Sequence, residues 1–460
     1  MIIIARKLLT LLTIVMLVVI PMIPRPAEAQ GLSLLRDAET EWFLREISTP
    51  FFEAAGLNPS AVSIYLIHDS SMNAFVTLGQ IMAIYSGLIQ SVDNVNQLEG
   101  VIAHETGHIA GGHAVRYREG QKAALKVLLV HVILGLAAAV AGSPDAAAGL
   151  LLGGQSMAQR VYLSYSRVQE STADQAAMTY LNTAGVSARG MIEFFDKIRD
   201  QELLTTSRRD PYVRTHPLSG DRILRLIDRA QASPYYDVPS SEEKVYWFKR
   251  IRAKIDGFIY DPEITLRMYP VRDQSLFARY ARVYAYQKAL RLDDALAEAT
   301  SLINENPDDP YFQEIAGQIL FEFGRIEQSL PYLRRAHELL PREPLIMTAL
   351  GHALVAMETP ETDREAVEVL ELAVFFDRQN GLAWRQLAVV YARTGRENMA
   401  NLATAEMFSL QGRYRDAVGR AQMAFKTFPE GTREWVQAQD LIFTATAEME
   451  KHPEQNRKRR

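Results

Sequence analysis

Hydrophobic residues in the first quarter of the chain follow two different periods. Over residues 34–55 they recur at the spacing of an amphipathic helix, and residues 56–60 then interrupt the pattern with Gly and Pro. Three short segments rich in β-branched, aromatic or alternating apolar residues follow, at 62–67, 73–77 and 80–86. Such segments favour strands. The pattern therefore predicts a helix followed by a small β-sheet.

A long helix is expected after the sheet. Asn94 is a favourable N-cap, and Gln97 three residues later approximates a capping box. Residues 123–154 are strongly apolar, but residues 142–145 divide them into pieces that fall short of the roughly 20 residues a spanning helix needs. We interpret this stretch as a helical hairpin buried in the protein, with peripheral contact to a membrane as the alternative. Further helices are predicted over 157–183, 191–204 and 221–232.

The pattern changes after about residue 265, where paired helices recur. Three pairs of markers are each 34 residues apart: Pro307 and Pro341, Pro310 and Pro344, and Gly317 and Gly351. This is the period of the tetratricopeptide repeat. The next step is 37 residues, which indicates a three-residue insertion within 358–363. The alternative is a helical bundle without repeats, and the shared period of three markers favours the repeat.

Length and composition fit an exported protein of two or three domains. A chain of 460 residues exceeds what one core usually organises. Arg6 and Lys7 precede an apolar run over residues 8–20, and Ala27-Glu28-Ala29 fits the small-residue cleavage rule, so residues 1–29 are predicted to be a signal peptide cleaved before Gln30. An uncleaved membrane anchor is the alternative. The chain has no cysteine, and a bacterial periplasm fits best.

Charge argues against nucleic acid as a partner. The net charge is −5 for the whole chain, and without residues 1–29 the chain holds 47 basic against 54 acidic residues. Proteins that bind nucleic acid usually carry a basic excess on the binding domain. The dense basic run at 456–460 is interpreted as a solvated tail.

The residues His104-Glu105-Thr106-Gly107-His108 carry the strongest chemical signal. Two histidines at i and i+4 project from one face of a helix and can bind one zinc ion. Glu105 follows the first histidine, so its carboxylate can accept a proton from a water molecule at the metal. The motif predicts a catalytic zinc site with His104 and His108 as ligands and Glu105 as general base.

The third ligand distinguishes the classes of zinc peptidase. A metzincin would place a histidine at position 114, but Ala114 stands there and His113 comes one residue early. An acidic residue on a later helix is the alternative. Glu170 is such a residue, and Asp174, one turn further, could hydrogen-bond a liganding histidine. Taken alone, residues 170–174 would fit a surface helix better.

Three motifs in order resemble those of the HtpX-like zinc metallopeptidases. They are His104-Glu105-x-x-His108, then Ser166-Arg167-x-x-Glu170-x-x-Ala173-Asp174, and then Thr215-His216-Pro217 with Arg222 five residues later. With an export signal and C-terminal repeats, the chain is most similar to the BepA-like periplasmic proteases within this family. The resemblance covers nearly the whole chain, although the repeat region is similar in architecture only.

The resemblance implies roles for several residues. Glu170 would be the third ligand of one Zn²⁺ per subunit, and Asp174 would support the ligand set. His216 would act in catalysis as a gating group, which either occupies the water site at rest or stabilises the oxyanion during turnover. Arg222 would tie the His216 loop to the core through a carboxylate. Without the family, His216 would be interpreted as an ordinary loop histidine.

Asn73, Ala74 and Phe75 also resemble the family's strand beside the active-site helix. An exposed strand edge there could bind an extended peptide by main-chain pairing, which would suit a protease of unfolded chains. A strand inside the sheet is the alternative.

The expected protein is mainly α-helical. An α+β zincin-like domain with a small β-sheet over residues 30–262 is followed by an all-α tetratricopeptide-repeat solenoid over 265–455. The favoured function is a periplasmic zinc endopeptidase that cleaves misfolded or misassembled envelope and outer-membrane proteins. By resemblance, the repeats would bind the outer-membrane assembly machinery. The alternative from another class is a chaperone or adaptor whose metal site is mostly closed; a vestigial metal site is opposed by the intact motif.

Overall fold

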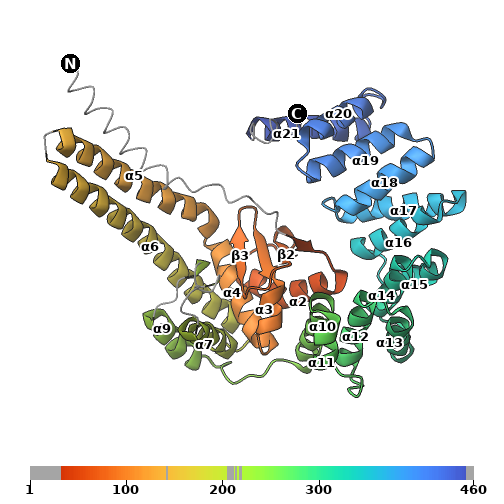
Figure 1. The fold of residues 1–460 in the computed structure, drawn as a ribbon, viewed down its shortest axis with the longest axis horizontal. Coiled ribbons are helices and arrows are strands. Elements are labelled where there is room, and N and C mark those ends of the chain that lie inside the picture. Colours follow the sequence, from red (N-terminus) through yellow and green to blue (C-terminus); the bar gives the residue numbers. More distant parts are fainter. Residues whose placement is uncertain (1–32, 141–142, 205–211, 213–214, 217–219, 452–460) are drawn as a thin grey trace. The chain divides into compact units, whose positions relative to one another are not determined.

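The computed structural model describes residues 33–140, 143–204, 212, 215–216 and 220–451. The predicted signal peptide, its cleavage site and Pro217 lie outside these residues. The chain forms two compact units, which divide between Lys249 and Arg250. Unit 1 holds the sheet, the histidine helix and the other helices before residue 250, whereas unit 2 holds the helices that follow, together with Asp37–Thr40 (Figure 1). The expected fold class, a small sheet with helices followed by helical repeats, is confirmed.

The sheet has four strands in the order β1-β2-β4-β3: β1 (Leu34–Leu35), β2 (Ser63–Ile67), β3 (Ala74–Thr77) and β4 (Ile81–Tyr85). The predicted strands are therefore confirmed within one or two residues. Strands β2 and β4 run parallel, with Tyr65 beside Ala83, and the other pairs are antiparallel. Strand β3 lies at one end of the described sheet.

The predicted helix over 34–55 is wrong at its start. Residues Leu34–Leu35 pair with β2, and helix α2 (Ala38–Ala54) begins only afterwards. Asp37 explains the boundary, because its carboxylate accepts a hydrogen bond from the backbone N–H of Thr40 at 2.8 Å. This is the contact of an N-cap, which fixes where a helix starts.

Helix α4 (Val95–Ala110) carries the histidine motif and is buried along nearly its whole length. The Asn94 side chain accepts from the backbone N–H of Gln97 at 2.9 Å, as the cap predicts. Two glycines allow close packing of neighbouring helices. A Cβ at Gly100 would lie 2.7 Å from Met191 Cα on α7, and one at Gly107 would lie 2.8 Å from the Ala173 carbonyl oxygen on α6.

Helices α5 (His113–Val140) and α6 (Pro144–Thr183) form the predicted hairpin and run side by side (Figure 1). The helix predicted over 157–183 is the second half of α6. The expectation that the hairpin is buried is wrong: only 6% of the most apolar window of α5 is buried. Over His113–Ala138, α5 is the one helix of the described chain that is long and apolar enough to cross a membrane.

Three further helices follow the hairpin: α7 (Arg189–Leu204), α9 (Gly220–Gln231) and α10 (Glu242–Ile259). The first two match the predicted helices. Unit 1 also contains the short helix α3 (Ser86–Ser91) and the 3-10 turn η2 (Pro59–Ala61).

Unit 2 repeats a pair of antiparallel helices along the chain. After α11 (Pro262–Met268), the pairs are α12 (Leu276–Lys288) with α13 (Leu292–Glu305), α14 (Pro310–Glu322) with α15 (Ile326–Leu339), α16 (Pro344–Met357) with α17 (Pro360–Phe376), α18 (Gly381–Arg393) with α19 (Glu397–Leu410), and α20 (Tyr414–Phe425) with α21 (Arg433–Lys451). Apolar residues between consecutive helices form the core.

The 34-residue markers have structural causes. Pro310 and Pro344 each occupy the first turn of a helix, where proline is favoured. Gly317 and Gly351 allow the partner helix to approach, since an added Cβ would lie 2.6 Å from Leu333 and 2.4 Å from Leu370. The extra residues of the third step lengthen α17, which has 17 residues where α15 has 14.

Candidate metal centre

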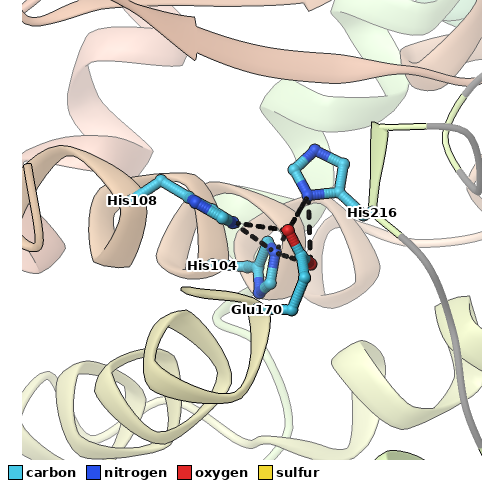
Figure 2. A group of neighbouring side chains, drawn as sticks. All are labelled: His104, His108, Glu170 and His216. Atoms are coloured by element: carbon cyan, nitrogen blue, oxygen red, sulfur yellow. Dashed lines mark hydrogen bonds and ion pairs between the residues drawn. The ribbon is translucent and has the colours of Figure 1, made fainter. Parts of the chain in front are cut away.

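Two helices of unit 1 and the segment between α7 and α9 place four metal-binding side chains together (Figure 2). His104 and His108 lie one turn apart on α4, and Glu170 comes from α6. His216 comes from the segment between α7 and α9. All four side chains are buried, and their ligand atoms lie within 4.8 Å of one another. The structure thus brings together the predicted metal ligands and the predicted gating histidine.

The close packing of α4 on α6 positions Glu170. Because Gly107 has no side chain, the backbone of α6 at Ala173 can approach α4 directly. Glu170 and Asp174 lie one turn apart on the same face of α6, on either side of this contact. A larger residue at position 107 would move both carboxylates away from the histidines.

The distances between the four groups fit one tetrahedral metal ion. Nε2 of His104 lies 3.0 Å from Nε2 of His108 and 3.3 Å from Nδ1 of His216. The Glu170 carboxylate lies 3.4 Å from each of the two Nε2 atoms and 3.2 Å from Nδ1 of His216. Four ligands at about 2.0–2.1 Å from a zinc ion would be separated by about 3.3–3.4 Å. The donor set therefore matches such an ion in size and in chemistry.

Electrostatics prepare the ligands for a cation. Burial lowers the pKa of His108 well below its usual value, although Glu170 opposes the shift. The pKa of Glu170 is held well below its usual value by the surrounding histidines, against the effect of burial. His108 is then neutral and Glu170 ionised, which are the forms that bind a metal.

His104 differs from His108, because the carboxylates around it favour a positive charge. Burial works against its protonation, but Asp174 and Glu170 raise its pKa to about 10. Nδ1 of His104 lies 3.0 Å from Oδ1 of Asp174, on the side of the ring opposite to the cluster. Asp174 therefore orients Nε2 toward the other ligand atoms, as a supporting carboxylate does at metal sites.

Arg222 on α9 holds both acidic residues. Its Nε and Nη2 donate to the two oxygens of Asp174 at 2.6 and 2.8 Å, and its Nη1 lies 3.2 Å from Glu170 Oε2. Such a bidentate contact fixes orientation as well as charge. The contact agrees with the expected tie between the His216 region and a carboxylate of the core.

Glu105 differs from the other carboxylates. Both of its oxygens are buried, and no donor among the described residues makes a hydrogen bond to them. Oε1 lies 3.4 Å from Nε2 of His216. Burial raises the pKa of Glu105. A desolvated carboxylate next to a metal site is suited to accept a proton.

Two residues near the cluster were missed by sequence reasoning. Nδ1 of His113, dismissed above as a ligand, lies 2.9 Å from Nδ1 of His108. The Tyr212 ring lies 4.6 Å from the His216 ring, and burial raises its pKa well above the usual value. The signal for His113 was its spacing of five residues from His108. For Tyr212 it was the spacing of four residues from His216, whose backbone N–H donates to the Tyr212 carbonyl at 2.7 Å.

The candidate substrate-binding strand lies at the end of the described sheet. Ala74 and Phe75 pair with β4 through the antiparallel register, and Asn73 directly precedes β3. Asn73 is buried, and the Thr215 hydroxyl lies 3.4 Å from its Oδ1. The strand is therefore connected through Thr215 to the segment that carries His216.

Comparisons with known proteins agree with this geometry. Residues 37–230 match the model of peptidase family M48. The chain is 26% identical to the beta-barrel assembly-enhancing protease of Yersinia pestis over 77% of this chain and 73% of that protein. It is 24% identical to the protein of the same name from Escherichia coli K12, over 84% and 78% of the two chains. It is also 30% identical to the metalloprotease LoiP of Escherichia coli K12, over 38% and 64%.

Proposed function

Since the chain belongs to peptidase family M48 through residues 37–230, we propose that it is a zinc-dependent metalloendopeptidase that cleaves misfolded or misassembled envelope proteins in the periplasm. The observation that carries this proposal is the convergence of His104, His108 and Glu170 beside the buried carboxylate of Glu105. Catalytic zinc sites combine three protein ligands with a nearby general base.

We assign the ligand role to Nε2 of His104, Nε2 of His108 and the carboxylate of Glu170. Two imidazoles and a carboxylate favour zinc over harder cations. A bound zinc ion would polarise the carbonyl oxygen of the substrate and make water more acidic. Asp174 would keep His104 in the orientation that this site requires, and Arg222 would hold Asp174.

Glu105 is the proposed general base. Its carboxylate would take a proton from the attacking water and pass it to the amide nitrogen of the leaving peptide. The raised pKa of Glu105 supports this role, because a base of moderately high pKa retains an accepted proton long enough to deliver it.

His216 is the proposed gate. Its Nδ1 takes the fourth corner of the cluster, 3.3 Å from His104 and 3.2 Å from Glu170. A substrate carbonyl would need that corner, so His216 would have to move before cleavage. The same closed arrangement is what a chaperone or adaptor with an inactive site would show, so the experiment below separates the two functions.

We infer the substrate class and the partners from the remainder of the chain. The end strand β3 could pair with an extended peptide, which selects unfolded chains rather than a sequence. Residues 265–455 would recruit partners, and the relatives' name connects them with β-barrel assembly. Unit 2 also contains a cavity of about 820 Å³ lined by apolar and charged residues, among them Phe375, Trp384, Met399 and Glu371. Such a cavity could hold an apolar side chain of a partner.

The decisive test compares the mature protein with Glu105→Gln and His216→Ala. We expect wild type to bind one zinc ion and Glu105→Gln to retain it while cleavage of an unfolded test protein falls by about 10²–10⁴-fold. His216→Ala should retain zinc and cleave faster than wild type. Glu46→Gln and His68→Ala change exposed residues of the same types and serve as controls.

Three other outcomes would each lead to a different assignment. Equal cleavage by wild type and Glu105→Gln would contradict the protease assignment. Slower cleavage by His216→Ala would assign His216 to stabilising the oxyanion rather than to gating. Binding of the unfolded protein without cleavage by any variant would favour the chaperone or adaptor.

A further inference from the structure

The distal part of the α5/α6 hairpin exposes apolar side chains on its outer faces. The two helices pack closely on each other: a Cβ at Gly154 would lie 2.3 Å from His131 Cβ, and one at Gly135 would lie 3.2 Å from Leu151. On the sides away from this contact, apolar side chains of both helices are exposed. Ile133 is 64% exposed and Leu152 is 68% exposed. Further exposed apolar residues of this part are Leu125, Leu129, Val130, Leu134 and Met157.

The exposed apolar residues of α5 are spread around the helix rather than along one stripe. At 3.6 residues per turn, positions 125, 129, 130, 133 and 134 cover about half of the circumference. The other half faces α6. A helix that is apolar all round is normally enclosed, either by a protein core or by lipid. No described element of the chain encloses α5, because only 6% of its most apolar window is buried.

Charges are distributed unevenly along the hairpin. Residues 127–159 contain one charged side chain, Asp145. The parts of the two helices next to this segment are strongly basic and contain one acidic residue, Glu119, before Glu170 of the metal centre. We call five of these basic residues the collar: Arg116, Lys122, Lys126, Arg160 and Arg167. The hairpin thus combines a distal half that has a single charged residue with a cationic base.

We propose that the distal half of the hairpin inserts into one leaflet of a lipid bilayer with anionic headgroups, and that the collar lies among those headgroups. The uncharged end of α5, residues 127–140, is about 21 Å long at 1.5 Å per residue. It is too short for a hydrocarbon core of about 30 Å but longer than one leaflet. Basic residues next to an apolar segment are attracted to anionic lipid.

Asp145 limits the depth of insertion. A carboxylate in the centre of a bilayer is costly, so the tip does not pass far beyond the leaflet that it enters. Its position in the first turn of α6 favours the negative charge, because the N-terminus of a helix carries partial positive charge. An oblique insertion that keeps the tip short of the middle of the bilayer satisfies both the apolar faces and Asp145.

A second copy of the chain fits the hairpin less well than lipid. A protein partner covers one stripe of a helix pair, whereas the exposed apolar residues occupy the free half of α5 and part of α6. Two hairpins aligned in parallel would also bring their collars together, and like charges repel. Lipid surrounds the whole distal half and supplies the opposite charge.

Insertion would place the metal centre at the membrane. Helix α6 continues without a break from the collar residue Arg160 to Glu170, about 15 Å further along the axis. The site would then work on chains close to the bilayer surface.

The test measures sedimentation of the chain from Gln30 with vesicles of phosphatidylcholine, with or without phosphatidylglycerol. The apolar run at residues 8–20 is left out because it would itself bind lipid. We expect binding to vesicles that contain phosphatidylglycerol, weakened by salt. Changing Leu129→Glu, Ile133→Glu and Leu152→Glu together should weaken binding at least about a hundredfold. Val271→Glu, Met423→Glu and Phe443→Glu change exposed residues of unit 2 and should bind like wild type.

A second variant keeps every apolar side chain. Lys122→Gln, Lys126→Gln and Arg160→Gln together should remove most of the preference for phosphatidylglycerol, at roughly fivefold per residue. Unchanged zinc content and circular dichroism show that each variant is folded. Equal vesicle binding by wild type and the three-glutamate variant, or no binding by wild type, would overturn the proposal. So would a dimer, formed without vesicles, that the three glutamates abolish, because the hairpin would then bind a second copy.

Discussion

Each unit of the protein buries a cluster of ionisable side chains, but the two clusters are built differently. In unit 2, Arg250 contacts the carboxylates of Glu39 and Asp309, and Lys254 contacts Glu39 and Asp37. The Tyr280 hydroxyl also donates to Glu39 at 2.7 Å. We call this group the ion cluster. Every one of these contacts joins a donor to an acceptor, so the buried charges compensate one another.

The metal centre of unit 1 lacks this internal balance. Its central contacts join lone-pair atoms to one another, such as the two Nε2 atoms of His104 and His108 at 3.0 Å. Two such atoms can share at most one proton, whereas a cation between them satisfies both. Most side chains of both clusters are buried. The distinguishing feature of a functional site is therefore the convergence of acceptors, not burial.

The pKa values follow the same division. Although burial opposes it, Glu39 and neighbouring acids raise the pKa of Arg250, and Asp37 and others raise that of Lys254, so both remain charged. In the metal centre, burial raises the pKa of Glu105 and lowers that of His108, so burial favours the neutral form of both residues. In the same centre the histidines lower the pKa of Glu170 and the carboxylates Asp174 and Glu170 raise that of His104, so the site combines shifts in both directions. Such strongly shifted pKa values gather at functional sites.

The largest expected effect is on the ion cluster. Arg250→Met leaves the buried Glu39 and the partly buried Asp309 without their main partner. Removing one member of a buried ion pair costs about 3–5 kcal/mol. We expect the free energy of unfolding in urea to fall by about this amount. Lys249→Met, an exposed neighbour on α10, should change it by less than about 0.5 kcal/mol. A loss as small for Arg250→Met as for Lys249→Met would contradict the assigned importance of the cluster.

A smaller effect is expected at the support of the metal ligands. Asp174→Asn keeps the shape of the side chain but removes the charge that orients His104. Loss of such a supporting group lowers metal affinity about 10–100-fold. Competition with a zinc chelator at constant pH measures this directly. The control is Asp196→Asn on α7, whose carboxylate is part of an exposed pair with Arg199; a similar loss in both variants would mean that the effect is general.

Local patterns predicted much of the fold and most of the candidate site. The i, i+4 histidines on α4 needed only helical spacing, and the 34-residue period reflected Pro at helix starts and Gly at close packing. Glu170 was selected through a family resemblance, because spacing alone left a surface helix as the better interpretation. Contact between α4 and α6 depends on packing across about 60 residues, and no local rule gives it.

Other features could not be predicted for identifiable reasons. A helix that is apolar all round has the same pattern in a protein core and in lipid, so the exposure of α5 was missed. The ion cluster joins Asp37 and Glu39 to residues more than 200 positions away, and its members have no common motif. Strand β1 has two residues, which is too short to show a period.

The smallest expected effect concerns His113. Its contact with His108 joins a donor to an acceptor, as the contacts of the ion cluster do. Nδ1 of His113 lies 2.9 Å from Nδ1 of His108 and can accept its proton, which leaves Nε2 of His108 free for a metal. His113→Phe keeps a ring without an acceptor and should lower zinc affinity about tenfold, the lower end for such support. His113→Gln retains an acceptor oxygen and should recover most of the loss. If both variants bind zinc as wild type does, His113 only fills space beside Gly111, and the orientation of His108 depends on α4 alone.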